Sequence, residues 1–305
     1  MSWMKRFVCL LWVLLAGLAS AQIPGLPSAS RSLNAVGVEH VAGIRSVGLE
    51  ARTPQVRARL MVHAPQGVQV DHPLWLGLEL THQPEWHTYW QNPGDSGLPT
   101  PLAWQLPTGL SAGRIVWPLP HKLKAGPLTN YGYDGTALLV VPIQVDARAA
   151  RASVLDIRLH ASWLVCRLEC IPQEADLAIS LPTHVTQVAH ADAFDAVLRQ
   201  QPDSIAARAS AQFEGAQLAL TIHDLPTAMR GRRIQIFPEQ ADVLHSASDQ
   251  HPQALQAWQG SALHLRLPQN PQRLDAPTQL SFLLTSGEGS ARVAARVMAA
   301  IDGAW

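Results

Sequence analysis

The stretch Val154–Pro172, which reads VLDIRLHASWLVCRLECIP, decides how the surrounding chain folds. In its first half, from Leu155 to Val165, apolar residues alternate with polar ones. A period of two is the pattern of a half-buried β-strand. If this register continues, Cys166 lies on the polar face, toward solvent or toward a covering loop.

The two cysteines of this stretch, Cys166 and Cys170, are four residues apart. In an extended strand that separation is roughly 13 Å, which exceeds the ~7 Å limit for a disulfide. A bond between them therefore requires a turn, and Pro172 just after them fits such a break. Because so short a loop would add only about 2 kcal/mol of stability, the spacing favours a reactive or metal-binding pair over a structural one.

The first 21 residues have the features of a secretory signal peptide. A basic pair precedes an apolar run, Phe7–Leu18, and Ala19-Ser20-Ala21 has the small residues of a cleavage site. The apolar run is too short to cross a membrane as a helix. Cys9 would leave with this segment, so Cys166 and Cys170 would be the only cysteines of the exported chain. Export would place them where disulfides form and persist.

The charge balance says little in favour of a charged partner. The sequence has 23 basic and 23 acidic residues. Loss of the signal peptide would remove two basic residues and leave 21 against 23, a net charge of −2. Such a chain gives no indication of nucleic acid or of an anionic membrane surface as its partner.

The remaining chain is predicted to be all-β, with two β-sandwich domains joined by a short helical connector. Short alternating runs recur in both halves, and no helix–strand alternation supports a parallel sheet. The expected parts are a loose lead-in over 22–52, a first domain over 53–185, a connector over 186–212 and a second domain over 213–305. The connector holds the helically spaced Ala191–Gln200. The second domain, which has no cysteine, would position the first or present a docking surface.

A long passage with weak periodicity, Thr81–Ala137, interrupts the first domain. Passages of this length are usually functional or disordered, and the many aromatic residues here argue against disorder. Asn92–Gly97 is a strong turn cluster, and short strands are predicted at Leu102–Gln105 and Gly113–Trp117. Four longer strands are predicted outside the passage: Val56–Val62, Leu74–Leu80, Leu138–Val145 and Ala175–Leu181.

Four motifs, in order, resemble the periplasmic domains of the DsbD/ScsB thiol:disulfide interchange proteins, a family that includes the copper-sensitivity-suppressor branch. They are Glu85–Gly97 (EWHTYWQNPGDSG), Val116–His121 (VWPLPH), Asn130–Gly135 (NYGYDG) and the cysteine segment Leu164–Pro172. The resemblance implies an immunoglobulin-like domain whose cysteine pair shuttles electrons. The second domain resembles the family more loosely.

The resemblance also implies partners and a mechanism. A membrane-embedded thiol reductase with a thioredoxin-like domain would reduce the pair, which would then reduce oxidised periplasmic thiol proteins such as disulfide isomerases. The exchange would run through a mixed disulfide and would need no cofactor beyond the Cys166–Cys170 disulfide. By analogy with the family, Cys170 would be the attacking thiol and Cys166 would resolve the mixed disulfide.

Several aromatic residues receive a role from the same resemblance. By position, His121–Gly135 corresponds to the family's cap loop, with Tyr131 and Tyr133 as its aromatics. We therefore expect Tyr131 or Tyr133 to pack over the cysteines and to swing away when a partner docks. The residues expected to line the same site are Trp86, His87, Tyr89 and Trp90.

Two other interpretations stay open. Three residues separate the cysteines, as in the copper-tolerance branch, and two thiolates suit Cu(I), so the protein could be a copper-binding or copper-tolerance protein. It could also be a non-catalytic interaction module with a structural disulfide. Family members usually continue into membrane and thioredoxin-like domains, whereas this sequence ends at Trp305, so it is either a stand-alone donor module or a fragment.

Overall fold

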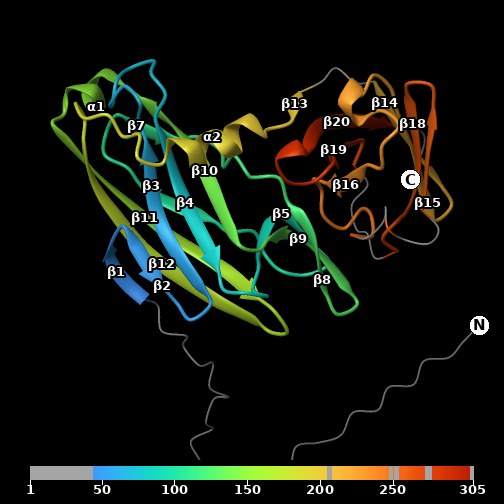
Figure 1. Ribbon diagram of the computed structural model, residues 1–305, viewed down its shortest axis with the longest axis horizontal. Helices are drawn as coiled ribbons and strands as arrows, with labels where there is room; N and C mark the ends of the chain where they lie inside the picture. The colour runs from blue at the N-terminus through green and yellow to red at the C-terminus, as the bar shows by residue number, and fades with distance from the viewer. Residues whose placement is uncertain (1–43, 205–207, 247–249, 251–253, 272–276, 303–305) are drawn as a thin grey trace, which may run out of the picture. The chain divides into compact units, whose positions relative to one another are not determined.

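The computed structural model is built mostly of β-strands (Figure 1). The residues that it describes are 44–204, 208–246, 250, 254–271 and 277–302. The predicted signal peptide, residues 1–21, lies outside the described residues. Within the described ranges, every helix is too short or too polar to cross a lipid bilayer.

The first domain is an immunoglobulin-like sandwich of two sheets, which confirms the predicted all-β fold. One sheet has the order β1 (Ile44–Gly48), β12 (Cys170–Pro182), β11 (Val154–Cys166) and β6 (Leu102–Gln105). The other has the order β2 (Glu50–Arg52), β3 (Val56–His63), β4 (Trp75–His82), β10 (Thr136–Val145) and β7 (Leu110–Ala112). Apolar side chains of both sheets, such as Leu78 and Leu159, share one buried core.

The start of the first domain differs from the expected lead-in over 22–52. β1 pairs in parallel with β12, and β2 pairs with β3. Strands of three to five residues are too short to show a period of their own. They form because a longer neighbouring strand supplies the hydrogen bonds, and the ordered chain therefore begins before Thr53.

The passage Thr81–Ala137 is also more regular than its sequence indicates. It contains β6 and β7 and, in addition, a three-stranded sheet in the order β5 (Thr88–Gly94), β9 (Leu128–Tyr133) and β8 (His121–Ala125). Five of the six residues of β9 are buried, so the strand has no exposed face, and because Thr129 and Asn130 are among them, its sequence has no apolar pattern. Gly113–Trp117, predicted as a strand, makes a single β-bridge, between Val116 and Val140.

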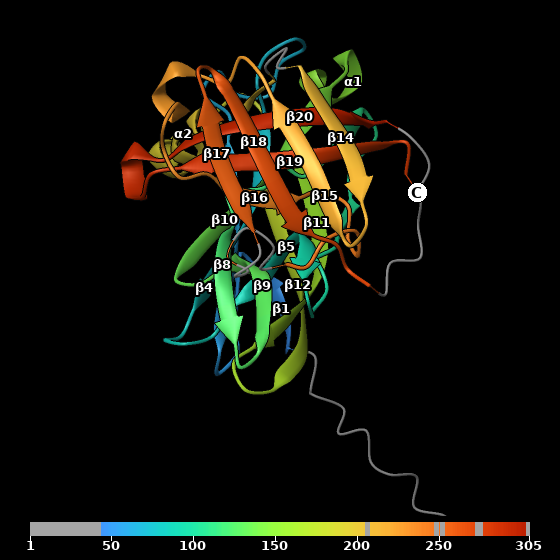
Figure 2. The same ribbon diagram turned by 90° about the vertical axis from the view of Figure 1, so that its right-hand side faces the viewer.

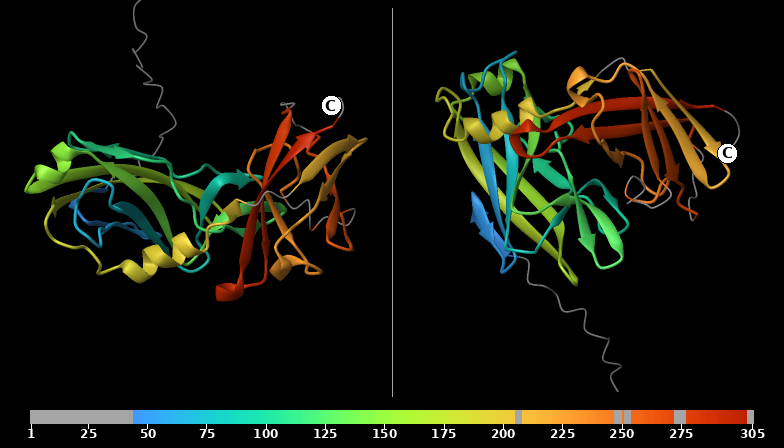
Figure 3. Two further views of the ribbon diagram at one scale, coloured as in Figure 1. Left: turned by 90° about the horizontal axis from the view of Figure 1, so that it is seen from above. Right: turned by 45° about the vertical axis from the view of Figure 1, so that its right-hand side comes forward.

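Two helices accompany the first domain. α1 (Ala147–Arg151) begins after Asp146, whose carboxylate accepts the N–H groups of Arg148 and Ala149. α2 (Ala191–Arg199) lies in the range predicted to be helical and buries Phe194 and Val197. These side chains pack on the outer face of the β3–β4–β10 part of the five-stranded sheet, opposite the sandwich core (Figure 3).

The second domain is one folded eight-stranded sheet. Its order is β16 (Gln235–Pro238), β19 (Gln279–Ser286), β20 (Val293–Ile301), β14 (Ala209–Glu214), β15 (Gln217–Ile222), β18 (Ala262–Pro268) and β17 (Leu255–Gln259), and β13 (Asp203–Ser204) pairs with β20. Figure 2 shows one half of this sheet, β14, β15, β18 and β17, crossing over β19 and β20. Leu220, Leu265 and Phe282 fill the core between the two halves. The short 3-10 helices Thr227–Met229 and Gly289–Ala291 lie between strands.

The second domain contacts the three-stranded sheet directly. Asn92 of β5 donates its side-chain N–H to the carbonyl of Pro238 at 2.8 Å. Arg292 donates to the carbonyl of Pro120, just before β8, at 2.6 Å. Burial lowers the pKa of Arg292 to about 10.

Candidate functional site

β11 and β12 form one long antiparallel hairpin that ends at the cysteines. The register is unbroken along both strands to the Cys166–Cys170 pair. Their Cα atoms lie 4.2 Å apart, and a disulfide joins the side chains. In an antiparallel ladder this close spacing belongs to a pair that exchanges no backbone hydrogen bonds, the position at which side chains approach most closely. The chain therefore turns between the cysteines, through Arg167-Leu168-Glu169, as the spacing requires.

The two cysteines differ in exposure. Cys166 is buried, with 3% of its surface accessible, whereas Cys170 is exposed. The polar–apolar alternation of β11 stops here, because Val165 and Cys166 are both buried. The alternation allowed two environments for Cys166, solvent or a covering loop, and in the structure a loop covers it. Leu168, between the cysteines, is 95% exposed.

The covering segment is Trp86–Thr88. The backbone N–H of His87 donates to the carbonyl of Cys166, and the N–H of Cys166 donates to the carbonyl of His87, both at 3.0 Å. Residues that exchange both backbone hydrogen bonds project their side chains from the same face. His87 therefore lies beside Cys166, on the edge of β11 that pairs farther back with β6 and lies opposite β12.

His87 carries an unused polar atom. Its side chain is 6% exposed, and its Nε2 has no hydrogen-bond partner among the described residues. Burial lowers the pKa of His87, and the charge of Asp134 opposes that shift only in part. The imidazole is therefore neutral at neutral pH and can accept a proton.

Tyr89 contacts the other sulfur. Its hydroxyl lies 3.5 Å from Sγ of Cys170. A disulfide sulfur has no hydrogen, so the hydroxyl is the donor. Burial raises the pKa of Tyr89, against the effect of a hydrogen bond with Ser96, and the hydroxyl keeps its proton at neutral pH. The rings of Tyr89 and His87 pack edge to face at 5.3 Å, so one segment supplies a neighbour to each cysteine.

The predicted turn cluster Asn92–Gly97 supports the Tyr89 ring. Gly97 has a φ of +104°, and a Cβ at this position would overlap that ring. Only glycine combines this backbone conformation with so close an approach. The turn is fixed to β9, because Ser96 donates its backbone N–H to the side-chain oxygen of Asn130 at 3.1 Å.

Trp86 lies at the exposed rim of the site. The guanidinium of Arg167 stacks over its ring at 5.2 Å and forms an ion pair with Glu85 at 3.4 Å. Both charged groups are largely exposed, so the ion pair adds little stability. These contacts connect the loop between the cysteines to the covering segment.

The remaining predicted site residues face other neighbours. Trp90 packs against Tyr131 and against Phe237 of the second domain, with ring centroids 6.4 and 6.1 Å away. Tyr131 donates its hydroxyl to the carbonyl of Ser246 at 2.6 Å, and Tyr133 donates to the carbonyl of Pro118 at 2.9 Å. Both tyrosines are buried. Their hydroxyls thus point to other partners, and the hydroxyl at the disulfide is that of Tyr89.

The difference follows from the strands. Tyr131 and Tyr133 belong to β9, the middle strand of its sheet, and not to a free loop. The side chain of Tyr89 could be assigned to Cys170 only once the register of β5 was known. Sequence reasoning also missed Ser96 and Leu168. The position of Leu168, in the turn between the two cysteines, can be seen in the sequence.

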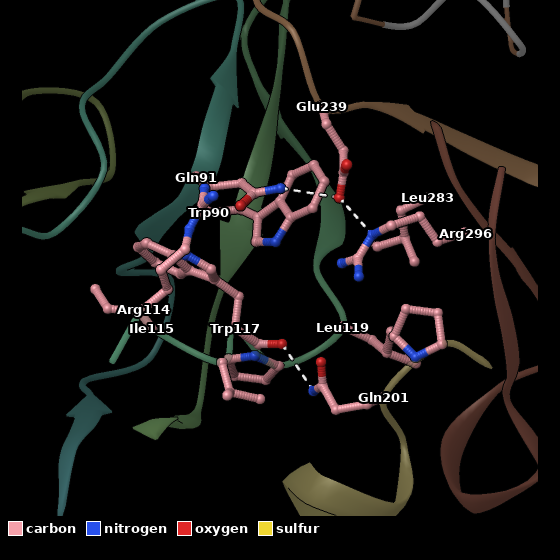
Figure 4. Close-up of a pocket in the computed structure, with 13 residues that line it drawn as sticks. Trp90, Gln91, Arg114, Ile115, Trp117, Leu119, Gln201, Glu239, Leu283 and Arg296 are labelled. Carbon is pink, nitrogen blue, oxygen red and sulfur yellow. Dashed lines mark hydrogen bonds and ion pairs between the residues drawn. The ribbon is translucent and has the colours of Figure 1, made fainter. Parts of the chain in front are cut away.

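A cavity of about 640 Å³ lies on the Trp90 side of β5. Figure 4 shows Glu239 in its wall, which accepts hydrogen bonds from Gln91 at 3.1 Å and from Arg296 at 2.9 Å. Gln201 of the connector donates to the carbonyl of Trp117 at 3.1 Å. Gln91, Glu239 and Arg296 thus bond to one another across this wall, and Gln201 bonds to the backbone.

The arrangement permits nucleophilic substitution at sulfur. A thiolate from outside can reach Cys170 but not the buried Cys166. Copper binds to thiolates, and in the disulfide form neither sulfur is a thiolate. In the described part of the chain, no three His, Cys, Asp or Glu side chains are grouped so as to hold a metal ion.

Comparisons with known proteins point to one family. Residues 57–182 match the family model described as "Thiol:disulfide interchange protein DsbD, N-terminal". The chain is similar in structure to the N-terminal periplasmic domain of ScsB from Proteus mirabilis, with 15% identity and a TM-score of 0.57. The match covers 82% of this chain and 97% of that one, and at this identity it shows the fold.

Other matches are weaker. A chimeric titin Z1Z2 structure matches at 12% identity over 83% of this chain and 100% of that one. The Ig1-2 module of the Drosophila receptor protein tyrosine phosphatase DLAR matches at 9% identity over 81% and 99%. Both have a TM-score of 0.19, too low to carry an argument. No curated protein matches the chain significantly.

Proposed function

Residues 57–182 belong to the DsbD N-terminal family of thiol:disulfide interchange proteins, and on this premise we propose that the chain passes electrons through its Cys166–Cys170 pair. A membrane-embedded thiol reductase with a thioredoxin-like domain would supply the electrons. Oxidised periplasmic thiol proteins, such as disulfide isomerases, would receive them. The exchange would take place in the periplasm, with the disulfide itself as the only redox group.

The observation that carries this proposal is the unequal exposure of the two sulfurs. Cys170 is exposed, beside the fully exposed Leu168, while Cys166 is 3% exposed. A partner thiolate can therefore attack only one end of the bond, which gives the exchange a defined order. The bond closes a loop of about five residues, from Cys166 to Cys170, and in the loop-entropy model it adds only about 2 kcal/mol of stability. So small a gain in stability gives little reason for the disulfide to be present.

The proposed reaction runs in two halves. In the first, a reductase thiolate attacks Sγ of Cys170, the Cys166–Cys170 bond breaks, and its electron pair leaves on Cys166, which takes up a proton. A second reductase thiol then releases Cys170 as a thiolate. In the second half, that thiolate attacks a partner disulfide, and Cys166 attacks Cys170 to release the partner as a dithiol. Two electrons and two protons pass to the partner.

Tyr89 would act on the nucleophile. A hydroxyl that donates to a thiolate forms a charge-assisted hydrogen bond, about twice as strong as a neutral one. The tyrosine keeps its proton at neutral pH because burial raises its pKa. It would therefore stabilise Cys170 both as a nucleophile and as a leaving group.

A redox titration tests the proposal. The mature protein is equilibrated with mixtures of reduced and oxidised glutathione, and its thiols are then counted by alkylation and mass spectrometry. We expect a potential between those of the glutathione pool and of structural disulfides. A pair that stays oxidised below about −300 mV would be a structural disulfide and would overturn the proposal. Stoichiometric, tight Cu(I) binding by the reduced protein, without exchange, would favour copper handling instead.

A further inference from the structure

The resolving cysteine needs a partner that takes its proton. Cys166 must attack as a thiolate, yet only 3% of its surface is accessible to solvent. Burial disfavours the charged form of a thiol, and water has little access to it. A buried resolving thiol therefore depends on a neighbouring base.

His87 is placed beside this thiol by the backbone. The two residues exchange both backbone hydrogen bonds at 3.0 Å and share one face. Directly opposed residues of this kind have Cβ atoms about 5 Å apart, within reach of an imidazole. Once the disulfide opens, the Cys166 side chain is free to turn about its Cα–Cβ bond toward the ring.

The other titratable groups near His87 are either engaged in hydrogen bonds or exposed to solvent. His82 of β4 uses both ring nitrogens, Nδ1 with the carbonyl of Gly135 at 2.9 Å and Nε2 with the hydroxyl of Thr88 at 3.0 Å. The hydroxyl of Tyr89 on β5 is directed to Cys170. Asp134, in the turn after β9, is exposed and acts on His87 through its charge. The unused Nε2 of His87 is the acceptor left for Cys166.

We propose that His87 is the general base of the resolving step, an inference that rests on the proposed function. As Sγ of Cys166 attacks Sγ of Cys170, the S–H bond of Cys166 breaks and an N–H bond forms at Nε2 of His87. The Cys166–Cys170 bond forms, the bond from Cys170 to the partner breaks, and the electron pair leaves on the partner sulfur. His87 then returns its proton to that thiolate or to water. In the opposite direction, protonated His87 gives its proton to Cys166 as that sulfur leaves.

This role predicts a specific pH dependence. Above the lowered pKa of His87 the base is neutral, so the rate of the resolving step should be flat across neutral pH. Without the base, the rate should follow the fraction of ionised thiol and rise about tenfold per pH unit.

Stopped-flow kinetics with excess 5,5′-dithiobis(2-nitrobenzoate) isolates the step. The first equivalent of thionitrobenzoate reports the attack by Cys170, and its rate depends on reagent concentration. The second reports resolution by Cys166 and reaches a concentration-independent rate. Both phases are measured from pH 5.5 to 8.5 in the mature wild-type chain, in His87→Gln and in the matched control His63→Gln.

His63 is a close match for His87. It is also 6% exposed, and its Nδ1 has no hydrogen-bond partner within the described ranges. It stacks between Trp75 and Phe194, in a cluster that contains neither cysteine. The control therefore reports what the loss of a buried imidazole does by itself.

We expect His87→Gln to slow the second phase about a hundredfold at pH 7, the lower end of general base effects, and to leave the first phase unchanged. His63→Gln should change neither phase. An identical second phase in wild type and His87→Gln at every pH would overturn the inference and leave the proposed function standing. If His87→Gln does not fold, the pH profile of the wild-type second phase tests the inference alone. A second-phase rate that rises about tenfold per pH unit would exclude a general base and overturn it. Wild-type protein that releases no second equivalent would instead contradict the proposed function.

Discussion

Tyr89 and Trp90 are consecutive residues of β5, yet they belong to different regions of the molecule. Tyr89 directs its hydroxyl to the exposed sulfur of the disulfide, 3.5 Å away. Trp90 packs on the opposite face of the strand, against Tyr131 and Phe237. One strand thus serves the cysteines with one face and the second domain with the other. Substitutions on the first face should change thiol chemistry, and substitutions on the second should change stability.

The cysteines themselves give the largest expected effect. Cys170→Ser should abolish exchange, because the remaining Cys166 is buried. Cys166→Ser should still attack and should accumulate a mixed disulfide that nothing resolves. Mass spectrometry after incubation with oxidised glutathione reads out both variants. The reverse pattern, with the adduct on Cys166, would show that exposure does not set the order of attack.

A substitution of Phe237 tests whether the Trp90 face of β5 affects stability and not thiol chemistry. Its ring is fully buried and packs against Trp90 and Tyr131, so Phe237→Ala should lower the free energy of unfolding by about 3 kcal/mol. The reaction of the folded protein with thiol reagents should be unchanged. Phe282→Ala, in the core of the second domain, is the control for a loss of equal volume. If Phe237→Ala alone altered thiol reactivity, the two faces of β5 would not be independent.

Tyr89 tests the face toward the disulfide. Tyr89→Phe removes one hydroxyl and keeps the ring, and the attack by Cys170 at pH 7 should slow about tenfold, the equivalent of about 1.4 kcal/mol for a charge-assisted hydrogen bond. Tyr133→Phe removes a hydroxyl that donates to Pro118 instead and should leave this rate unchanged. Equal rates in both variants would remove Tyr89 from the mechanism.

The buried histidines predict how stability depends on pH. Burial lowers the pKa of His82 and the pKa of His87 below 6.5. Below pH 6.5 the unfolded chain therefore binds protons that the folded chain excludes, and stability falls as the pH decreases, by up to about 1.4 kcal/mol per pH unit for each histidine. Urea unfolding of wild type and His82→Gln between pH 7.5 and 5 measures this. An equally steep decrease in the variant would show that His82 does not contribute.

Tyr131 carries the smallest expected effect. Tyr131→Phe loses the hydrogen bond to the carbonyl of Ser246 and should cost about 1 kcal/mol of stability. The rate at which hydrogen peroxide oxidises the reduced cysteines should not change. Faster oxidation in this variant, or in Tyr133→Phe, would support the cap role that the family resemblance implies for these tyrosines.

The sequence was informative wherever a strand is rich in apolar residues or alternates them with polar ones. β3, β4, β10 and β11 were predicted within two residues of their bounds, and the short spacing of the cysteines required the turn that joins β11 to β12. β9 could not be predicted, because its buried positions include Thr129, Asn130 and Gly132, which give it no apolar pattern.

Side-chain neighbours across strands were harder to predict than the strands. The family motifs placed both Tyr89 and Tyr131 near the cysteines, but the register of β5 and the contact with the second domain decide which of them reaches a sulfur. The pairing of His87 with Cys166 is a single bridge between segments far apart in the chain, and no local pattern reveals it.

Gly97 gives the molecule a point at which its reactivity could be tuned by design. The residue has no side chain and no charge, yet its missing Cβ is the space that the Tyr89 ring occupies. An alanine there would strain the turn and displace the ring from its place beside Cys170, without altering a sulfur, a hydroxyl or a base. A substitution at Gly97 would therefore change the reactivity of Cys170 through the position of the Tyr89 ring, while every reacting group stays the same.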